Sequence, residues 1–189
     1  VAGSPHPHIV RVWDHSAADG MLILATEAHG TSLRRMLAQR RFGLPEALQI
    51  AQQVGAALAF AHAHGVAHGL LTPAAVEIAS SGMARVNDFG LVQVAHALRA
   101  TCPGDRGARQ GYFPPETSRE PIVTALTDIF HLGALLWELT LGTPPAPRVA
   151  LALLPAHVEL PEPLRRVISA CMQPRPADRP QDIVDVLIA

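Results

Sequence analysis

The 189-residue sequence contains no lysine, a single asparagine, one tyrosine and two cysteines. Every basic residue is therefore Arg or His, and no site built from this chain can use a Lys ammonium group. Asn87 is the only residue that can supply an asparagine amide. Cys102 and Cys171 lie far apart and lack the spacing of a metal motif, so we expect two reduced thiols.

Acidic and basic residues nearly balance, which gives a net charge of −1 and a pI of about 6.9. Such a charge offers no electrostatic basis for binding nucleic acid or an anionic membrane. No apolar run approaches the ~20 residues that a membrane span needs. We therefore expect one domain in the cytoplasm, without nucleic acid as a partner and without membrane insertion by this segment.

Hydrophobic patterning predicts two β-hairpins followed or separated by helices. The first hairpin pairs 9–13 with 21–26 around a turn at 17–20, and the second pairs 76–78 with 84–86. Helices are expected at 33–41, 45–64, 127–141, near 147–154, 162–172 and 180–188, with a long ordered loop over 92–120. Five apolar residues at helical spacing predict one buried stripe on the helix 45–64: Leu48, Ala51, Val54, Leu58 and Ala61.

Two neighbouring stretches carry a family resemblance. Residues 68–76, His-Gly-Leu-Leu-Thr-Pro-Ala-Ala-Val, resemble the catalytic loop of protein kinases, His-Arg-Asp-Leu-Lys-Pro-x-Asn, without a gap. The kinase tripeptide Asp88-Phe89-Gly90 follows. Other stretches resemble kinase motifs in kinase order: 6–10, 26–30, 61–68, 111–116, 127–133 and 171–180. The chain is thus identified as a member of the protein kinase family, similar to bacterial serine/threonine kinases of the eukaryotic-like type.

The resemblance implies an α+β fold that is mostly α. Residues 30–189 would form the larger, helical lobe of a kinase, and residues 1–29 would be the last strands of the smaller lobe and the hinge. The glycine-rich loop, the phosphate-binding Lys and the helix whose Glu pairs with that Lys have no counterpart in the sequence. We expect either a half-kinase or, as the working interpretation, one domain that is part of a longer protein.

The residues that perform kinase chemistry are replaced in this alignment. Gly69 stands where the resemblance expects Arg, Leu70 replaces the catalytic Asp, Thr72 replaces a Lys, and Ala75 replaces the Asn that holds magnesium. Leu70 cannot accept a proton, and loss of a positioned general base lowers a rate by ~10²–10⁴-fold. We therefore expect no catalytic residue, a degenerate active site, and a pseudokinase that is not an enzyme.

Nucleotide binding is expected to be equally impaired. Asp88 keeps one carboxylate for Mg²⁺, but Ala75 removes its partner, so Asp88 is at most a weak magnesium site. Thr26, as gatekeeper, and Glu27, in the hinge, would complete a vestigial cofactor cleft with Asp88. We expect no cofactor, and no Mg-ATP in particular.

The positions that hold the shape of a kinase are retained. By the resemblance, Glu116 and Arg179 form a buried ion pair, Asp128 accepts hydrogen bonds from the backbone of the catalytic loop, and His68 stacks with Phe89. The predicted structural residues are His68, Phe89, Gly90, Glu116, Asp128 and Arg179. Histidines offer no better alternative, because Gly65 ends the helix between His64 and His68 and so breaks the spacing of a zinc pair.

Three functions remain open at this point. The first is a protein-interaction scaffold or allosteric regulatory module, with a protein partner or other domains of the same protein. The second is a nucleotide-binding sensor without phosphoryl transfer. The third is an atypical enzyme that uses the kinase fold for another transfer, although no spacing argues for a particular reaction.

Overall fold

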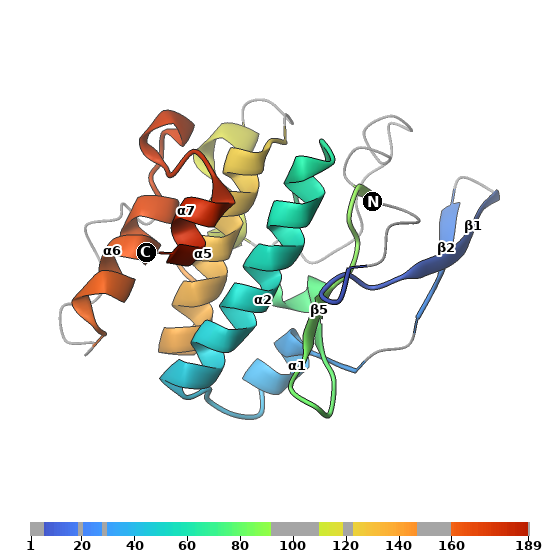
Figure 1. Cartoon of the computed structure of the whole chain (residues 1–189), viewed down its shortest axis with the longest axis horizontal. Helices are drawn as coiled ribbons and strands as arrows, with labels where there is room; N and C mark the ends of the chain where they lie inside the picture. Colours follow the sequence, from blue (N-terminus) through green and yellow to red (C-terminus); the bar gives the residue numbers. More distant parts are fainter. Residues whose placement is uncertain are drawn as a thin grey trace.

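The computed structural model describes residues 6–18, 21–27, 30–91, 110–118, 123–146 and 160–188. Two long helices, α2 (Leu44–Ala63) and α5 (Ala125–Leu141), lie side by side in its middle (Figure 1). α6 (Glu162–Cys171) packs on α5, and α7 (Ile183–Ile188) packs on α2. A β-hairpin projects on the opposite side from α6 (Figure 1). The described part is therefore α+β and mostly α, as predicted.

The projecting hairpin consists of β1 (Val12–Ala18) and β2 (Met21–Thr26), paired antiparallel with a register irregularity near Val12. The hairpin was predicted, but its first strand begins three residues later than expected. Residues 12–16 are exposed on both faces of the strand, so no apolar alternation marks the polar residues after Trp13 as part of it. Ile9 instead forms an isolated parallel bridge with Val86.

A second, three-stranded sheet joins β3 (Thr31–Ser32), β4 (Val76–Ile78) and β5 (Ala84–Val86) in that order, all antiparallel. The pair β4–β5 is the predicted second hairpin. β3 was not predicted, since two residues are too few for a pattern. It leads directly into α1 (Leu33–Leu37), which ends four residues before the predicted limit.

Gly43 is the N-cap of α2, and Pro45 lies in the first turn of the helix. The helix ends shortly before Gly65, which has a φ of 72°. The predicted buried stripe is correct except for Leu48, which is 37% exposed. The burial centres on Ala47, Ile50, Val54, Ala57 and Ala61, so Leu48 lies at the margin of the stripe.

α5 is the central helix, and nearly every residue from Thr127 to Leu139 is buried because α2 and α6 pack against it. It begins two residues earlier than predicted, since Thr124 and Thr127 form a reciprocal capping box. Gly142, with a φ of 70°, ends it. Asp128, His131 and Glu138, described below, lie on this helix.

The C-terminal elements follow the predicted pattern with one shift. α6 confirms the helix expected at 162–172. α7 begins at Ile183 and not at residue 180, because Pro176–Asp178 form a 3-10 turn and the Asp182 side chain accepts from the backbone N–H of Val184 at 2.9 Å. Within the predicted loop, residues 110–118 hold the 3-10 turns η2 (Gln110–Tyr112) and η3 (Pro115–Ser118). The rest of that loop, and the helix expected near 147–154, lie outside the described residues.

Candidate active-site region

The loop 66–75 connects α2 to β4 through the 3-10 turn η1 (Pro73–Ala75), and Asp128 of α5 fixes its backbone. Asp128 is fully buried. Its Oδ2 accepts from the backbone N–H of His68 at 2.7 Å, and its Oδ1 accepts from the N–H of Gly69 at 2.7 Å. Gly69 has a φ of 79°, a conformation that glycine adopts without strain. One carboxylate thus sets the path of the loop at the position where Leu70 follows.

Two histidines complete the surroundings of that carboxylate. His62 of α2 donates from Nε2 to Asp128 Oδ2 at 2.8 Å. His131 Nδ1 lies 3.7 Å from Asp128 Oδ1, too far for a hydrogen bond, and is the one buried side-chain nitrogen or oxygen of the described residues that has no hydrogen-bond partner. Burial alone would raise the pKa of Asp128, but His131 and His62 outweigh it and hold the pKa below its ordinary value. Asp128 is therefore ionised.

His68 is held by both ring nitrogens. Nε2 donates to the carbonyl oxygen of Asn87 at 2.9 Å, and Nδ1 accepts from the backbone N–H of Leu70 at 3.3 Å. Its ring packs against Phe89 with centroids 4.8 Å apart. Burial lowers the pKa of His68 to about 4, although the charge of Asp128 acts in the opposite direction. His68 is therefore a neutral structural residue that ties the loop to the segment before Asp88.

The replaced positions of the loop have structural roles of their own. Thr72 is buried, and its hydroxyl oxygen accepts from the N–H of Ala74 at 3.3 Å, which caps the turn η1. Ala75 is buried, and its carbonyl oxygen accepts from the N–H of Asn87 at 2.8 Å. Leu70 is half-buried at the middle of the loop. These contacts hold the loop without a charged side chain at either position.

Asp88 follows β5 in a conformation that is uncommon for a residue with a side chain, with a φ of 64°. Its N–H donates to Oδ1 of Asn87 at 3.0 Å, so the only asparagine of the chain stabilises this bend. Gly90 has a φ of 79° two residues later. Backbone in such a region is found disproportionately at functional sites, so Asp88 remains a candidate site residue.

The predicted hinge residues lie at the end of β2. Thr26 pairs with Val12, and the N–H of Glu27 donates to the carbonyl oxygen of Arg11 at 2.9 Å. The Glu27 carboxylate forms an ion pair of 2.8 Å with Arg85 of β5. Glu27 therefore ties the hairpin to the three-stranded sheet.

The predicted ion pair between Glu116 and Arg179 is present and bidentate. Arg179 Nη1 lies 2.7 Å from Oε1 and Nη2 lies 2.8 Å from Oε2 of Glu116. The Arg179 side chain is fully buried and also donates to the carbonyl oxygens of Gln173 and Leu126 at 2.8 Å each. Arg179 thus joins η3, the start of α5 and the segment before α7.

One buried cluster was missed at the sequence level. Glu138 of α5 is 3% exposed, accepts from Arg34 Nη1 on α1 at 2.7 Å, and accepts from the hydroxyl of Tyr112 at 2.6 Å. Burial raises the pKa of Tyr112 well above its ordinary value, and the charge of Glu138 adds to that effect. A carboxylate inside an apolar helix needs partners, so Glu138 was the available signal, although its partners could not be read from the sequence.

Comparisons with known proteins agree with this geometry. Residues 1–186 match the family model described as protein kinase domain. The chain is 32% identical over 189 residues to the serine/threonine-protein kinase PkaA of Streptomyces coelicolor, covering 93% of this chain and 35% of that protein. It is 32% identical over 199 residues to the serine/threonine-protein kinase PknD of Mycobacterium tuberculosis, covering 97% and 30%.

A solved structure shows the same fold. The kinase domain of Mycobacterium tuberculosis PknI, in a cysteine-to-alanine mutant, superposes with a TM-score of 0.76 at 27% identity, covering 99% of this chain and 71% of that one. The chain therefore belongs to the protein kinase family, and it spans about a third of the length of PkaA and PknD. The resemblance to bacterial serine/threonine kinases, stated above from motifs, is confirmed.

The same comparisons overturn two predictions. The prediction that the chain is not an enzyme is wrong, because the relatives are named as serine/threonine-protein kinases, which are enzymes. The prediction of no cofactor is also wrong, because protein kinases act on Mg-ATP. Both predictions were drawn mainly from replaced and missing motif residues, whereas the family match extends over residues 1–186. None of the described helices has the length and apolar character that crossing a bilayer requires.

The residues present fit a magnesium-bound nucleotide in one respect. Mg²⁺ is held in proteins by one or two carboxylates together with phosphate oxygens and water, and Asp88 supplies one carboxylate at a bend fixed by Asn87. Bound Mg-ATP would supply a transferable phosphoryl group. Among the described residues, no group of three or more His, Cys, Asp or Glu side chains is arranged to hold a metal ion by itself.

Proposed function

Because the chain belongs to the protein kinase family, we propose that it is a kinase-fold regulatory module, which binds a protein partner or other domains of its own protein. The observation that carries the proposal is the division of the site into two parts. The contacts of Asp128 and Arg179 support a retained kinase framework, while the loop that Asp128 holds carries Leu70 and Ala75 where the kinase motif has charged and polar residues. A framework of this kind preserves the shape of the domain surface, and a protein partner binds to that surface.

A surface suited to a partner lies on the β1–β2 hairpin. It exposes three large apolar side chains, Val12 at 40%, Trp13 at 60% and Ile23 at 53%. Arg11 lies over the Trp13 ring at 4.4 Å from its centroid. An isolated two-stranded ribbon has little stability of its own, and exposed apolar residues gathered on one element are typical of interaction sites. An ion pair connects this hairpin to β5, and β5 leads into the bend before the Asp-Phe-Gly tripeptide.

Nucleotide sensing is a second candidate function, and the strained bend at Asp88 favours it. In that case Mg-ATP would bind at Asp88, and the ion pair between Glu27 and Arg85 would transmit the change from β5 to the hairpin.

We also propose a cytoplasmic location. The free, buried thiol of Cys171 is consistent with a reducing compartment.

Hydrogen exchange tests the interaction surface directly. Backbone exchange of residues 12–26 is measured in the whole protein, purified with any bound partner from its own cells, and in residues 1–189 alone. The third sample is the Trp13→Ser variant of the whole protein, which removes the most exposed of the three apolar side chains named above. The proposal predicts slower exchange of the hairpin in the whole protein and loss of part of that protection in the variant. Equal exchange of the hairpin in all three samples would contradict it.

A further inference from the structure

The buried carboxylate of Asp128 has room for one more hydrogen bond. From the described residues it accepts three, at Oδ2 from the N–H of His68 and from Nε2 of His62, and at Oδ1 from the N–H of Gly69. An ionised carboxylate can accept about four. Nδ1 of His131 lies 3.7 Å from Oδ1 and is the nearest candidate for the fourth donor.

His131 is held beside the carboxylate without bonding to it. Its side chain is 2% exposed, and its Nδ1 lacks a hydrogen-bond partner, which is uncommon for a buried polar atom. A proton on Nδ1 would draw this nitrogen to about 2.8 Å from the carboxylate oxygen. A lone pair on Nδ1 would repel that oxygen, so the separation of 3.7 Å corresponds to a neutral His131 that carries its proton on Nε2.

Histidines alone face the charge of Asp128 among the described residues. The ion-pair contacts of Asp128 are with His62 of α2 and with His131 of α5, and the chain contains no Lys. From the loop, Asp128 faces His68, which burial keeps neutral.

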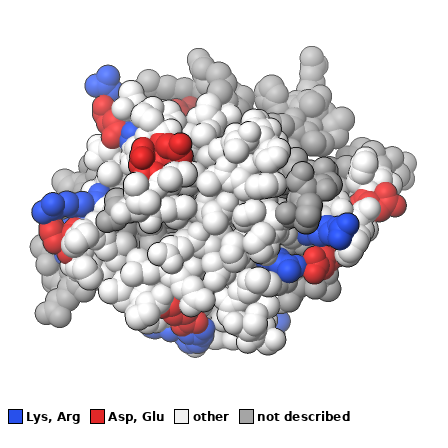
Figure 2. Space-filling model, viewed as in Figure 1, with Lys and Arg blue, Asp and Glu red and all other residues white. Residues whose placement is uncertain are grey.

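The surroundings on the side of α2 are otherwise uncharged. This helix carries no Arg, Asp or Glu between Ala47 and its end at Ala63. The middle of the face shown in Figure 2 is likewise covered mainly by side chains other than Lys, Arg, Asp and Glu. Because histidine is the side chain whose charge ordinarily changes between about pH 5 and 8, the balance of charge around Asp128 depends on pH.

We propose that His131 is a proton-operated positioning residue of the loop 66–75. When Nδ1 takes up a proton from solvent, its charged N–H donates to Oδ1 of Asp128. The oxygen is drawn toward His131 by up to about 0.9 Å, the difference between 3.7 Å and an ordinary charge-assisted bond of about 2.8 Å. This contact fills the fourth acceptor position of the carboxylate.

The movement reaches the loop through Gly69. Asp128 and His131 are three residues apart on one helix, so their side chains adjust while the backbone of α5 stays in place. The same Oδ1 accepts from the N–H of Gly69 at 2.7 Å, and a separation near 3.6 Å is no longer a hydrogen bond. The loop therefore either follows the carboxylate or loses this bond, and Leu70 moves with it. The inference goes beyond the proposed function and does not depend on which partner the module binds.

Nuclear magnetic resonance tests the proposal in the whole protein, labelled with ¹³C in histidine and ¹⁵N in glycine. Over about pH 8 to 5, the ring signals of His131 should change in one step. The amide proton of Gly69 should shift upfield with the same midpoint, because its hydrogen bond lengthens. His131→Leu should abolish the step at Gly69. His64→Leu is the matched control and should preserve it, since His64 is exposed and its Nδ1 donates to the carbonyl oxygen of Phe60 at 2.8 Å.

Three results would overturn the proposal. The first is a Gly69 signal that stays constant over this pH interval in the wild-type protein. The second is a step at Gly69 that persists in folded His131→Leu, which would assign the proton to another group such as His62. The third needs no variant and decides the question if His131→Leu does not fold: ring signals of His131 that remain those of a neutral imidazole, or that change with a midpoint different from that of Gly69.

Discussion

Glu116 and Arg179 are 63 residues apart in the sequence, and their side chains meet in a bidentate pair with nitrogen–oxygen distances of 2.7 and 2.8 Å. Glu116 lies in η3, and Arg179 lies between the 3-10 turn Pro176–Asp178 and α7. Arg179 also donates to the carbonyl oxygen of Leu126, so it connects the C-terminal segment to both η3 and α5. Its geometry leads to the first prediction.

Arg179→Ala should lower the free energy of unfolding by about 3–5 kcal/mol, because it leaves the Glu116 carboxylate without its charge partner and several carbonyl oxygens without a donor. Urea denaturation followed by circular dichroism measures the change. Arg175→Ala is the matched control, since Arg175 is 82% exposed and its contact to Asp178 is 3.9 Å. The control should change stability by less than about 1 kcal/mol. Similar losses for both variants would refute the structural role of Arg179.

Asp128→Asn should destabilise the loop 66–75 as well as the fold. An amide can accept on one side only, so its NH₂ group faces either the N–H of Gly69 or the donors of His68 and His62. Each orphaned buried donor costs about 1–3 kcal/mol. Hydrogen exchange at His68 and Gly69 should accelerate relative to the rest of the chain. Asp185→Asn, on the exposed face of α7, is the control and should leave exchange in the loop as it is.

His68 predicts a pH dependence of stability. Its pKa falls from an ordinary 6.5 to about 4 in the folded protein, so the unfolded chain binds the proton first as the pH decreases. Stability should therefore fall between pH 6.5 and 4, by about 3 kcal/mol from this residue. His68→Gln removes this titration, and its unfolding free energy should change less over the same interval. Parallel curves for the two proteins would show that His68 does not contribute.

Leu70 predicts a gain of rate. If its place in the loop corresponds to the general base of kinases, Leu70→Asp should raise phosphoryl transfer from Mg-ATP by the whole protein by ~10²-fold or more. Transfer of radiolabelled phosphate to the protein itself and to a generic basic substrate measures it. Ala74→Asp adds the same carboxylate at an exposed position of the same loop and should leave the rate unchanged. An equal effect of both substitutions would reject the assignment of Leu70.

Motif order identified Asp128, His68, Glu116 and Arg179, and the structure has the contacts that the resemblance implied for these four residues. Their roles in the protein remain predictions. Glu138 was missed because its partners come from α1 and η2, elements whose packing no local pattern encodes. The exposure of Leu48, at the margin of the buried stripe of α2, likewise could not be predicted from the local spacing of apolar residues.

The two erroneous predictions, that the chain is not an enzyme and that it takes no cofactor, have a related cause. They were argued mainly from replaced side chains in one loop, although the Thr72 hydroxyl and the Ala75 backbone carbonyl hold that loop by contacts of their own.

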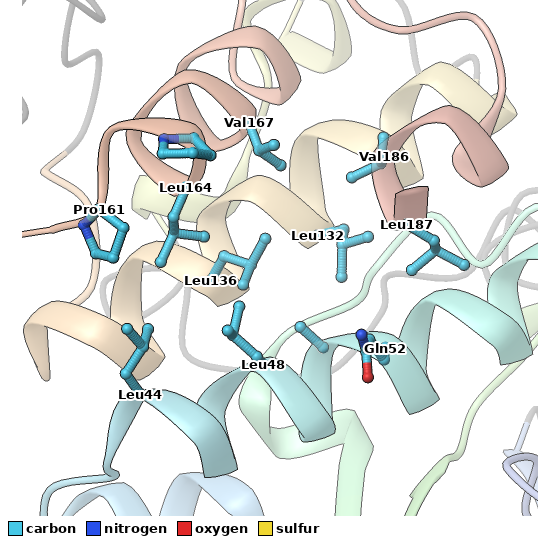
Figure 3. A pocket seen from close by; sticks show the side chains of 12 residues that line it. Leu44, Leu48, Gln52, Leu132, Leu136, Pro161, Leu164, Val167, Val186 and Leu187 are labelled. Atoms are coloured by element: carbon cyan, nitrogen blue, oxygen red, sulfur yellow. The ribbon is translucent and has the colours of Figure 1, made fainter. Parts of the chain in front are cut away.

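The apolar pocket between α2, α5, α6 and α7 (Figure 3) was also not predicted. Its lining comes from four helices, and the residues that each helix contributes have the pattern of ordinary core residues.

The nucleotide-sensing form of the regulatory proposal is tested most directly by hydrogen exchange of the whole protein with and without saturating Mg-ATP, repeated with Asp88→Ala. We expect Mg-ATP to slow exchange near Asp88 and to change exchange in the β1–β2 hairpin, which an ion pair connects to β5. Asp88→Ala should abolish these changes. Exchange that is unaltered by Mg-ATP, or altered only around Asp88, would contradict nucleotide sensing through the hairpin.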